Sequence, residues 1–234
     1  MNLEERFDRV MARIHAAETA AGRPKGSVQL IAVSKFQPAS AIREAYQWGQ
    51  RHFGENYLQE AIAKQDALRD LDDIVWHFIG PVQSNKTRPI AERFDWVHSL
   101  SHTKTILRLN EQRPQDLPPL NVCVQVNVSR ESTKSGVEIE DLDHFIEVFS
   151  TLDRVRLRGL MAIPAPLASD EADPAKPFRD LRHVKDVLSV PLDTLSMGMS
   201  DDLEWAILEG ATWVRIGTAV FGPRQASARI GISE

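Results

Sequence analysis

The residue with the most evident chemical potential is Lys35, which follows the short apolar run Leu30–Val33 and Ser34. Such a run predicts a buried strand, and Pro38 suits the first turn of a following helix. The end of a barrel strand is where such folds deliver reactive groups. If Lys35 points inward, desolvation favours its neutral amine, which can form a Schiff base with an aldehyde. The alternative is a solvated lysine at a strand end.

A second group of polar residues lies near the end of the chain. Arg215 and Gly217 share one face of a predicted strand, and a glycine there lets a ligand approach the backbone. Barrel loops after strands 7 and 8 often bind phosphate, and here they supply Ser200, expected as a helix N-cap, and Thr218. Singly, these residues could be only a cap, a turn or an ion-pair partner. Together with Lys35 they predict a site for a phosphorylated aldehyde.

Asn56 closes another predicted strand, on the face that it shares with Gly54 and His52. It is therefore expected near the same end of the barrel. His77 and His98 lie in strands but lack the spacing of metal ligands, so we expect them to be polar core histidines and predict no metal site.

A regular alternation of strands and helices must position these residues. Strands are expected at residues 28–35, 51–56, 75–80, 95–100, 121–128, 157–163, 192–197 and 213–217. Helices are expected at residues 3–21, 38–48, 57–69, 85–93, 102–112, 139–150, 177–189 and 200–210, with a short one near the C-terminus.

Eight strands that alternate with helices in 234 residues predict a (β/α)8 TIM barrel with an extra N-terminal helix laid against it. A doubly wound open sheet is the alternative, but the first strand–helix turn lacks a G-x-G-x-x-G fingerprint. No linker or composition shift divides the chain, so residues 1–234 are expected to form a single domain.

The composition restricts the function classes further. A net charge of −5 argues against general nucleic-acid binding, which needs a basic face. No apolar run approaches the roughly 20 residues that span a membrane, and no apolar signal core follows the charged N-terminus, so we expect a cytoplasmic protein. Cys123, the only cysteine, lies in an apolar run and is expected to be a buried, inert thiol.

Seven sequence blocks, in order, closely resemble the pyridoxal-phosphate (PLP) homeostasis proteins, the single-domain relatives of the alanine racemase barrel. The blocks are Ala32–Lys35, Phe53–Tyr57, His77–Lys86, Lys134–Gly136, Arg158–Pro164, Ser196–Asp202 and Val214–Ala219, within a resemblance that runs from Leu3 to Arg224.

The resemblance implies a role for each candidate residue. Lys35 would carry PLP as an internal aldimine, and Asn56 would line the ring. Ser200, Gly217 and Thr218 would hold the phosphate, and Arg215 would face the pyridine nitrogen. One departure is that many members follow the lysine with Thr and Lys, where this chain has Phe36 and Gln37. The second lysine of that motif is therefore absent here.

The function that we expect is that of a monomeric PLP carrier in vitamin B6 homeostasis, without substantial catalysis and with apo PLP-dependent enzymes as possible recipients. A PLP-dependent racemase of the alanine racemase type is one alternative, although the chain offers only Tyr46 and Tyr57 as tyrosine bases. A Schiff-base aldolase that uses a barrel lysine without any cofactor is another.

Overall fold

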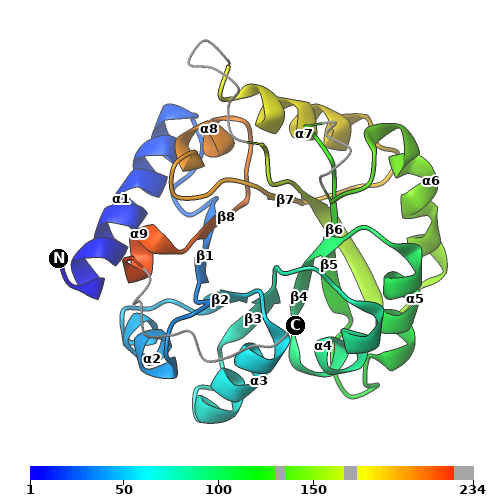
Figure 1. Ribbon diagram of the computed structural model, residues 1–234. Helices are drawn as coiled ribbons and strands as arrows, with labels where there is room; N and C mark the ends of the chain where they lie inside the picture. Colours follow the sequence, from blue (N-terminus) through cyan, green and yellow to red (C-terminus); the bar gives the residue numbers. More distant parts are fainter. Residues whose placement is uncertain (130–134, 166–172, 224–234) are drawn as a thin grey trace.

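The computed structural model describes residues 1–129, 135–165 and 173–223. Within these ranges eight parallel strands form a closed barrel, in which each strand pairs with the next and β8 pairs with β1 (Figure 1). This closure confirms the predicted (β/α)8 barrel and excludes the open doubly wound sheet. No helix in the described ranges has the length and apolar character needed to cross a membrane.

The strands and helices alternate along the chain as predicted. The strands are β1 (Gln29–Val33), β2 (His52–Glu55), β3 (Val75–Phe78), β4 (Trp96–Leu100), β5 (Leu120–Gln125), β6 (Val155–Met161), β7 (Thr194–Ser196) and β8 (Trp213–Ile216). The α-helices are α1 (Leu3–Ala20), α2 (Ala39–Gln47), α3 (Leu58–Ala67), α4 (Thr87–Arg93), α5 (Thr103–Gln112), α6 (Leu142–Glu147), α7 (Lys176–Val187), α8 (Leu203–Leu208) and α9 (Thr218–Phe221). Short 3-10 helices are η1 (Ser84–Lys86), η2 (Ile139–Asp141) and η3 (Val148–Thr151).

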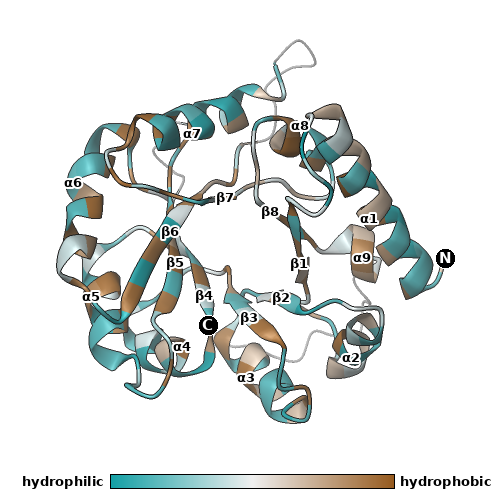
Figure 2. Ribbon diagram, turned by 180° about the vertical axis from the view of Figure 1, so that it is seen from behind, coloured by the Kyte–Doolittle hydropathy of each residue, from teal (hydrophilic) through white to brown (hydrophobic). Residues whose placement is uncertain are grey.

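The hydrophobic core has two layers. The larger one lies between the barrel and the surrounding helices, whose outer faces are hydrophilic (Figure 2). The smaller one fills the barrel interior and consists of Ile31, Trp96, Cys123, Met161 and Trp213. Cys123 is fully buried, and burial raises the pKa of its thiol, which confirms the expected inert cysteine.

The extra N-terminal helix packs against the last two helices of the barrel (Figure 1). Asn2 and Glu5 cap α1 reciprocally, as a capping box does. On its inner side, Arg13 pairs with Glu204 of α8, with 2.7 Å between Nε and Oε1. The helix therefore supports the segment that leads from β7 into α8.

Several boundaries differ from the prediction because local hydrogen bonds end the sheet ladder early. Strand β5 ends at Gln125, where the chain also begins to pair with Val137. The Val126 amide still donates to Met161 of β6, whereas the Asn127 amide donates to the Val137 carbonyl. Strand β6 lies about two residues earlier than expected, and the carbonyl of Ala162 beyond its end accepts from Arg215. The helix predicted at residues 139–150 divides into η2, α6 and η3.

The prediction that Ser200 is a helix N-cap is wrong. Helix α8 begins at Leu203, and Asp202 occupies the N-cap position. The Asp202 carboxylate accepts from the Met199 amide (2.5 Å) and thereby forms a tight turn that holds Ser200 before the helix. The Ser200 carbonyl accepts from Arg13 (2.9 Å).

Candidate functional site

Lys35 lies just beyond the carboxyl end of β1 and is half-buried. Ile31 belongs to the barrel interior, as predicted for the face that also carries Val33 and Lys35. The chain then turns sharply, with the Gln37 amide donating to the Ser34 carbonyl (3.0 Å). The lysine is thus delivered to the mouth at the carboxyl ends of the strands, where TIM barrels place their active sites.

Asn56 follows the last residue of β2 and lies at the same end of the barrel. Its side-chain oxygen Oδ1 is buried and has no hydrogen-bond partner among the described residues. A Cβ on Gly80 would lie only 2.1 Å from the Asn56 carbonyl oxygen, so this close approach of two strand ends requires glycine. A buried amide without a partner is costly for the protein alone and is suited to a bound ligand.

Arg215 projects from β8 into the barrel and is only 5% exposed. Its guanidinium donates to the Ser196 hydroxyl and to the Ala162 carbonyl, both at 2.8 Å. Desolvation lowers the pKa of Arg215 to about 10, so the group remains a cation at neutral pH. Among the described residues no carboxylate forms an ion pair with it, which leaves a buried positive charge below the mouth.

Ser200, Gly217 and Thr218 lie in the segments that follow β7 and β8, as predicted. Gly217 packs against Val33 of β1, and an added Cβ would lie 3.3 Å from the Val33 carbonyl oxygen. Thr218 is exposed and opens the short helix α9. The end of β8 therefore lies directly beside the strand that carries Lys35.

A buried chain of hydrogen bonds links Arg215 to three histidines of the barrel interior. His98 contacts the Ser196 hydroxyl (2.9 Å), His77 contacts His98 (2.9 Å), and His52 contacts His77 (3.0 Å). Burial confirms that His77 and His98 are core histidines. The sequence did not predict the hydrogen bond between them. Their inward positions on consecutive strands, together with that of His52, were the available signal.

The proton positions in this chain follow from Arg215, which can only donate. The Ser196 hydroxyl accepts a hydrogen bond from Arg215 and can donate one to Nδ1 of His98. Nε2 of His98 then donates to Nδ1 of His77, whose Nε2 donates to Nδ1 of His52. This assignment gives each hydrogen bond of the chain one donor and one acceptor and leaves all three imidazoles neutral.

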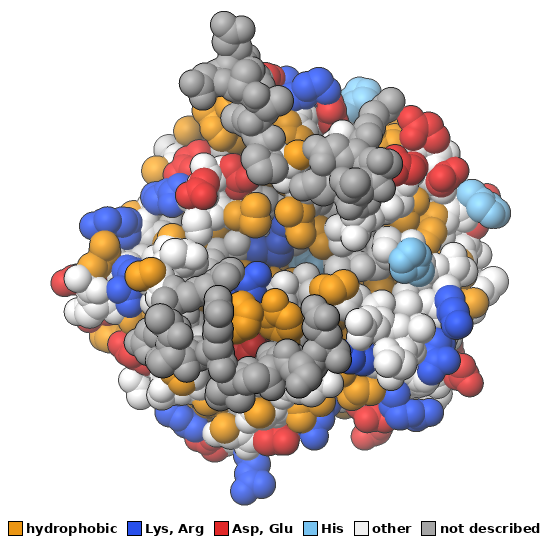
Figure 3. Space-filling model, viewed as in Figure 1, with side chains coloured by type: hydrophobic (Ala, Val, Ile, Leu, Met, Phe, Trp, Pro, Cys, Tyr) orange, Lys and Arg blue, Asp and Glu red, His pale blue; other side chains and the backbone are white. Residues whose placement is uncertain are grey.

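These residues fit a phosphorylated pyridine aldehyde. The mouth offers the Lys35 amine to an aldehyde, and it offers a ring the buried Asn56 Oδ1 and the buried Arg215 cation, which can donate to a ring nitrogen. The hydroxyl and backbone N–H groups of Ser200, Gly217 and Thr218 are complementary to a phosphate. Figure 3 shows Lys and Arg side chains together with apolar ones near the barrel axis on this face. Lys134, one of the residues that carry the family resemblance, lies outside the described residues.

Comparison with known proteins agrees with this geometry. The family model of the alanine racemase N-terminal domain matches residues 7–225. The pyridoxal phosphate homeostasis protein of Pseudomonas aeruginosa is 59% identical over 226 residues, which cover 97% of each chain. The protein of the same name from Escherichia coli strain K12 is 48% identical over 228 residues, 94% of this chain and 96% of the relative.

Among solved structures, PipY of Synechococcus elongatus PCC7942 with PLP bound has a TM-score of 0.80 and 42% identity, covering 94% of this chain and all of PipY. Alanine racemase of Corynebacterium glutamicum has a TM-score of 0.63 at 17% identity, with 94% of this chain and 62% of the racemase covered, so it shares the fold alone. By its sequence and its barrel, the chain belongs to the pyridoxal phosphate homeostasis protein family.

Proposed function

We propose that this protein binds pyridoxal phosphate covalently at Lys35 and serves PLP homeostasis as a carrier. The observation that carries the proposal is the buried Arg215 cation, without a carboxylate partner among the described residues, below the mouth that presents Lys35 and Asn56. A buried charge of this kind is costly unless a ligand compensates it. The relatives named as PLP homeostasis proteins and the PLP-bound PipY support the identity of that ligand.

Each candidate residue has a separate task in this proposal. Lys35 supplies the amine for a Schiff base, and the Asn56 amide lines the ring. Arg215 donates to the pyridine nitrogen. Ser200, Gly217 and Thr218 hold the phosphate through hydroxyl and backbone N–H groups. The bound cofactor supplies the aldehyde for attachment and, in enzymes, an electron sink.

We further propose that the protein holds and releases the cofactor without substantial turnover. Arg215 cannot give up a proton at ordinary pH, so a ring nitrogen that accepts from it stays unprotonated and withdraws electrons weakly. Tyr46 bonds Asp73 on the outside of the barrel. Tyr57 is exposed and packs on Phe36, with 5.1 Å between ring centroids. Neither tyrosine has the buried setting of a second base opposite Lys35.

We propose that the protein is a cytoplasmic monomer that comprises one domain over residues 1–234 and gives its cofactor to apo PLP-dependent enzymes. The net charge of −5 supports a partner other than nucleic acid.

The attachment is tested by absorption spectroscopy and mass spectrometry. Protein loaded with PLP should show the visible band of a lysine Schiff base, and borohydride should fix the cofactor mass on Lys35. Lys35→Ala should lose both signals. Lys86→Ala is the matched control, because Lys86 also lies in the segment that follows a barrel strand, in η1. An adduct on another lysine, or a band that survives in Lys35→Ala, would overturn the assignment.

A further inference from the structure

Lys64 of α3 is an unusual residue, because a lysine that is only 6% exposed needs several partners. Its ammonium contacts Oε1 of Glu55 (2.7 Å), Oε1 of Glu60 (2.6 Å) and the Ser34 carbonyl (2.7 Å). Glu55 is fully buried, and burial raises the pKa of its carboxyl. We call Glu55, Glu60 and Lys64 the ionic clamp.

The ionic clamp holds the backbone on both sides of Lys35. Before the lysine, the Ser34 hydroxyl donates to Glu55 (2.6 Å) and the Ser34 carbonyl accepts from Lys64. After the lysine, the Phe36 amide donates to Glu60 (2.6 Å). Each member of the clamp therefore contacts a residue adjacent to Lys35 in the chain.

Between these attachments the backbone adopts a strained conformation. Phe36 has a φ of 62°, and no other non-glycine residue in the described ranges has a positive φ. Such a conformation is unfavourable for a residue with a side chain and persists only where the surroundings impose it. The hydrogen bond from the Phe36 amide to Glu60 is one contact that imposes it.

Resting on the proposed function, we propose that Glu55, Lys64 and Glu60 are positioning residues that fix the Lys35 turn so that the amine meets the cofactor aldehyde. In that step the Lys35 nitrogen adds to the aldehyde carbon, a C=N bond replaces C=O, and the oxygen leaves as water. Nothing is oxidised or reduced. Small misplacements of reacting groups slow such steps by one to two powers of ten.

A purely structural role would be satisfied by any contact that ties α3 to the barrel. Helix α3 already buries Leu58 and Ala61 for that purpose. The clamp instead buries two carboxylates against one ammonium, and Oε2 of both Glu55 and Glu60 lacks a hydrogen-bond partner among the described residues. Because apolar residues often stabilise as well as buried ion pairs do, the choice of charges points to a geometric task.

The test compares Glu60→Ala, which removes the acceptor of the Phe36 amide, with Glu60→Gln, which keeps an acceptor oxygen. Asp66→Ala is the matched control, because Asp66 also lies on α3 and forms an ion pair with Arg93, but at an exposed position. Apo protein is mixed with PLP, the rate of appearance of the Schiff-base band is followed by stopped flow, and the adduct on Lys35 is quantified after borohydride reduction.

Glu60→Ala should slow band formation about tenfold or more. Glu60→Gln and Asp66→Ala should stay within about twofold of the wild type, which is too small to indicate misplacement. Ser34→Ala, a small change that is expected to fold, should slow attachment in the same direction by less. Unchanged rates in both Glu60→Ala and Ser34→Ala would overturn the clamp, as would an equal loss in Asp66→Ala. A wild type that forms no adduct on Lys35 would overturn the proposed function itself, which separates the two failures.

Discussion

Arg215 is the residue at which the interior of the barrel meets its mouth. Its two hydrogen bonds go to neutral oxygens, of Ser196 and Ala162, and no carboxylate of the described residues forms an ion pair with it. Such a site is expensive for the empty protein and favours the binding of a ligand that accepts a hydrogen bond from Arg215. Ligand binding therefore stabilises the fold by mass action, so the loaded protein should resist unfolding more than the empty one.

The proposed phosphate contacts give the first prediction at this scale. Charge-assisted hydrogen bonds contribute roughly 1.5–3 kcal/mol each, so losing two should weaken binding by two or more powers of ten. Ser200→Ala combined with Thr218→Val should raise the dissociation constant for PLP accordingly, as measured by titration of the visible band. Pyridoxal, which lacks the phosphate, is the control ligand and should be affected far less. If the wild-type protein bound pyridoxal as tightly as PLP, the proposed phosphate site would be contradicted.

At the scale of elements, β2, β3 and β4 each place one histidine in the barrel interior. Burial lowers the pKa of His52 to about 4 and of His98 to about 3, and it lowers the pKa of His77 well below its usual value. In the unfolded chain a histidine titrates near 6.5. Between about pH 6.5 and 4 the unfolded state therefore binds more protons, and stability falls as the pH falls.

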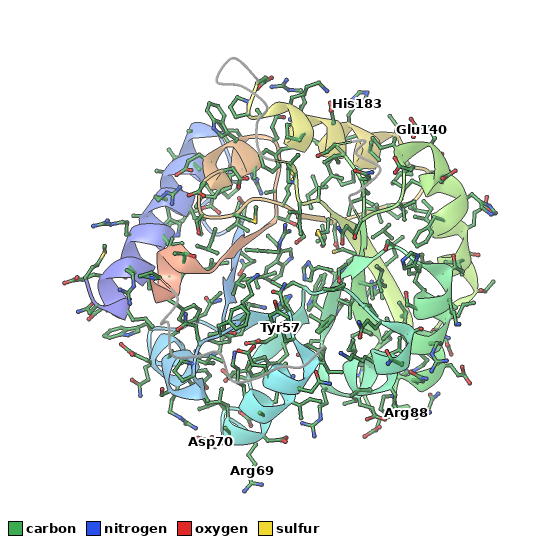
Figure 4. All side chains as sticks on the ribbon, viewed as in Figure 1. Tyr57, Arg69, Asp70, Arg88, Glu140 and His183 are labelled. Carbon is green, nitrogen blue, oxygen red and sulfur yellow. The ribbon has the colours of Figure 1, made fainter. Side chains whose placement is uncertain are left out.

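The second prediction is a steep acid dependence of the free energy of unfolding. Each buried histidine can contribute up to about 1.4 kcal/mol per pH unit in this window, and its full contribution is present above pH 6.5. Urea unfolding of the apo protein at several pH values should show this slope, and His98→Gln should reduce it. His183→Gln is the control, because His183 lies on the outer side of α7 (Figure 4). Equal slopes in all three proteins would contradict the argument.

The sequence predicted the order of the elements because period-2 and period-3.6 patterns are local. The prediction of strand ends failed where a residue outside the strand determines the pairing. An example is Val137, which forms a bridge with Val126 just after β5. The expected Ser200 cap failed for a similar reason, since Asp202 offered an equally suitable side chain and formed the turn. The histidine chain and the ionic clamp join residues of neighbouring elements, and their hydrogen bonds depend on how the side chains of those elements pack together.

At the scale of the whole molecule, the exposure of Tyr57 beside the mouth bears on what the proposed carrier does with its cofactor. Tyr57 is exposed and lies near the barrel axis, whereas Arg88 and His183 lie at the periphery (Figure 4). An exposed cofactor face suits transfer to a recipient, whereas carbanion chemistry benefits from exclusion of water. Gel filtration with light scattering should therefore report a monomer, with no second subunit to close the site.

The last prediction is that the loaded protein shows no racemase or transaminase activity of physiological size. A second base would contribute about 10²–10⁴-fold by general acid–base catalysis. The proposed contact of Arg215 with the ring nitrogen would also make the cofactor a weak electron sink. The loaded protein is incubated with L-alanine and other amino acids, while chirality and keto-acid formation are followed. Turnover at about 1–10³ per second would show that the protein is an enzyme and would contradict the carrier proposal. We expect only a slow trace of activity. The loaded protein should also activate an apo PLP-dependent enzyme, whereas Lys35→Ala should not.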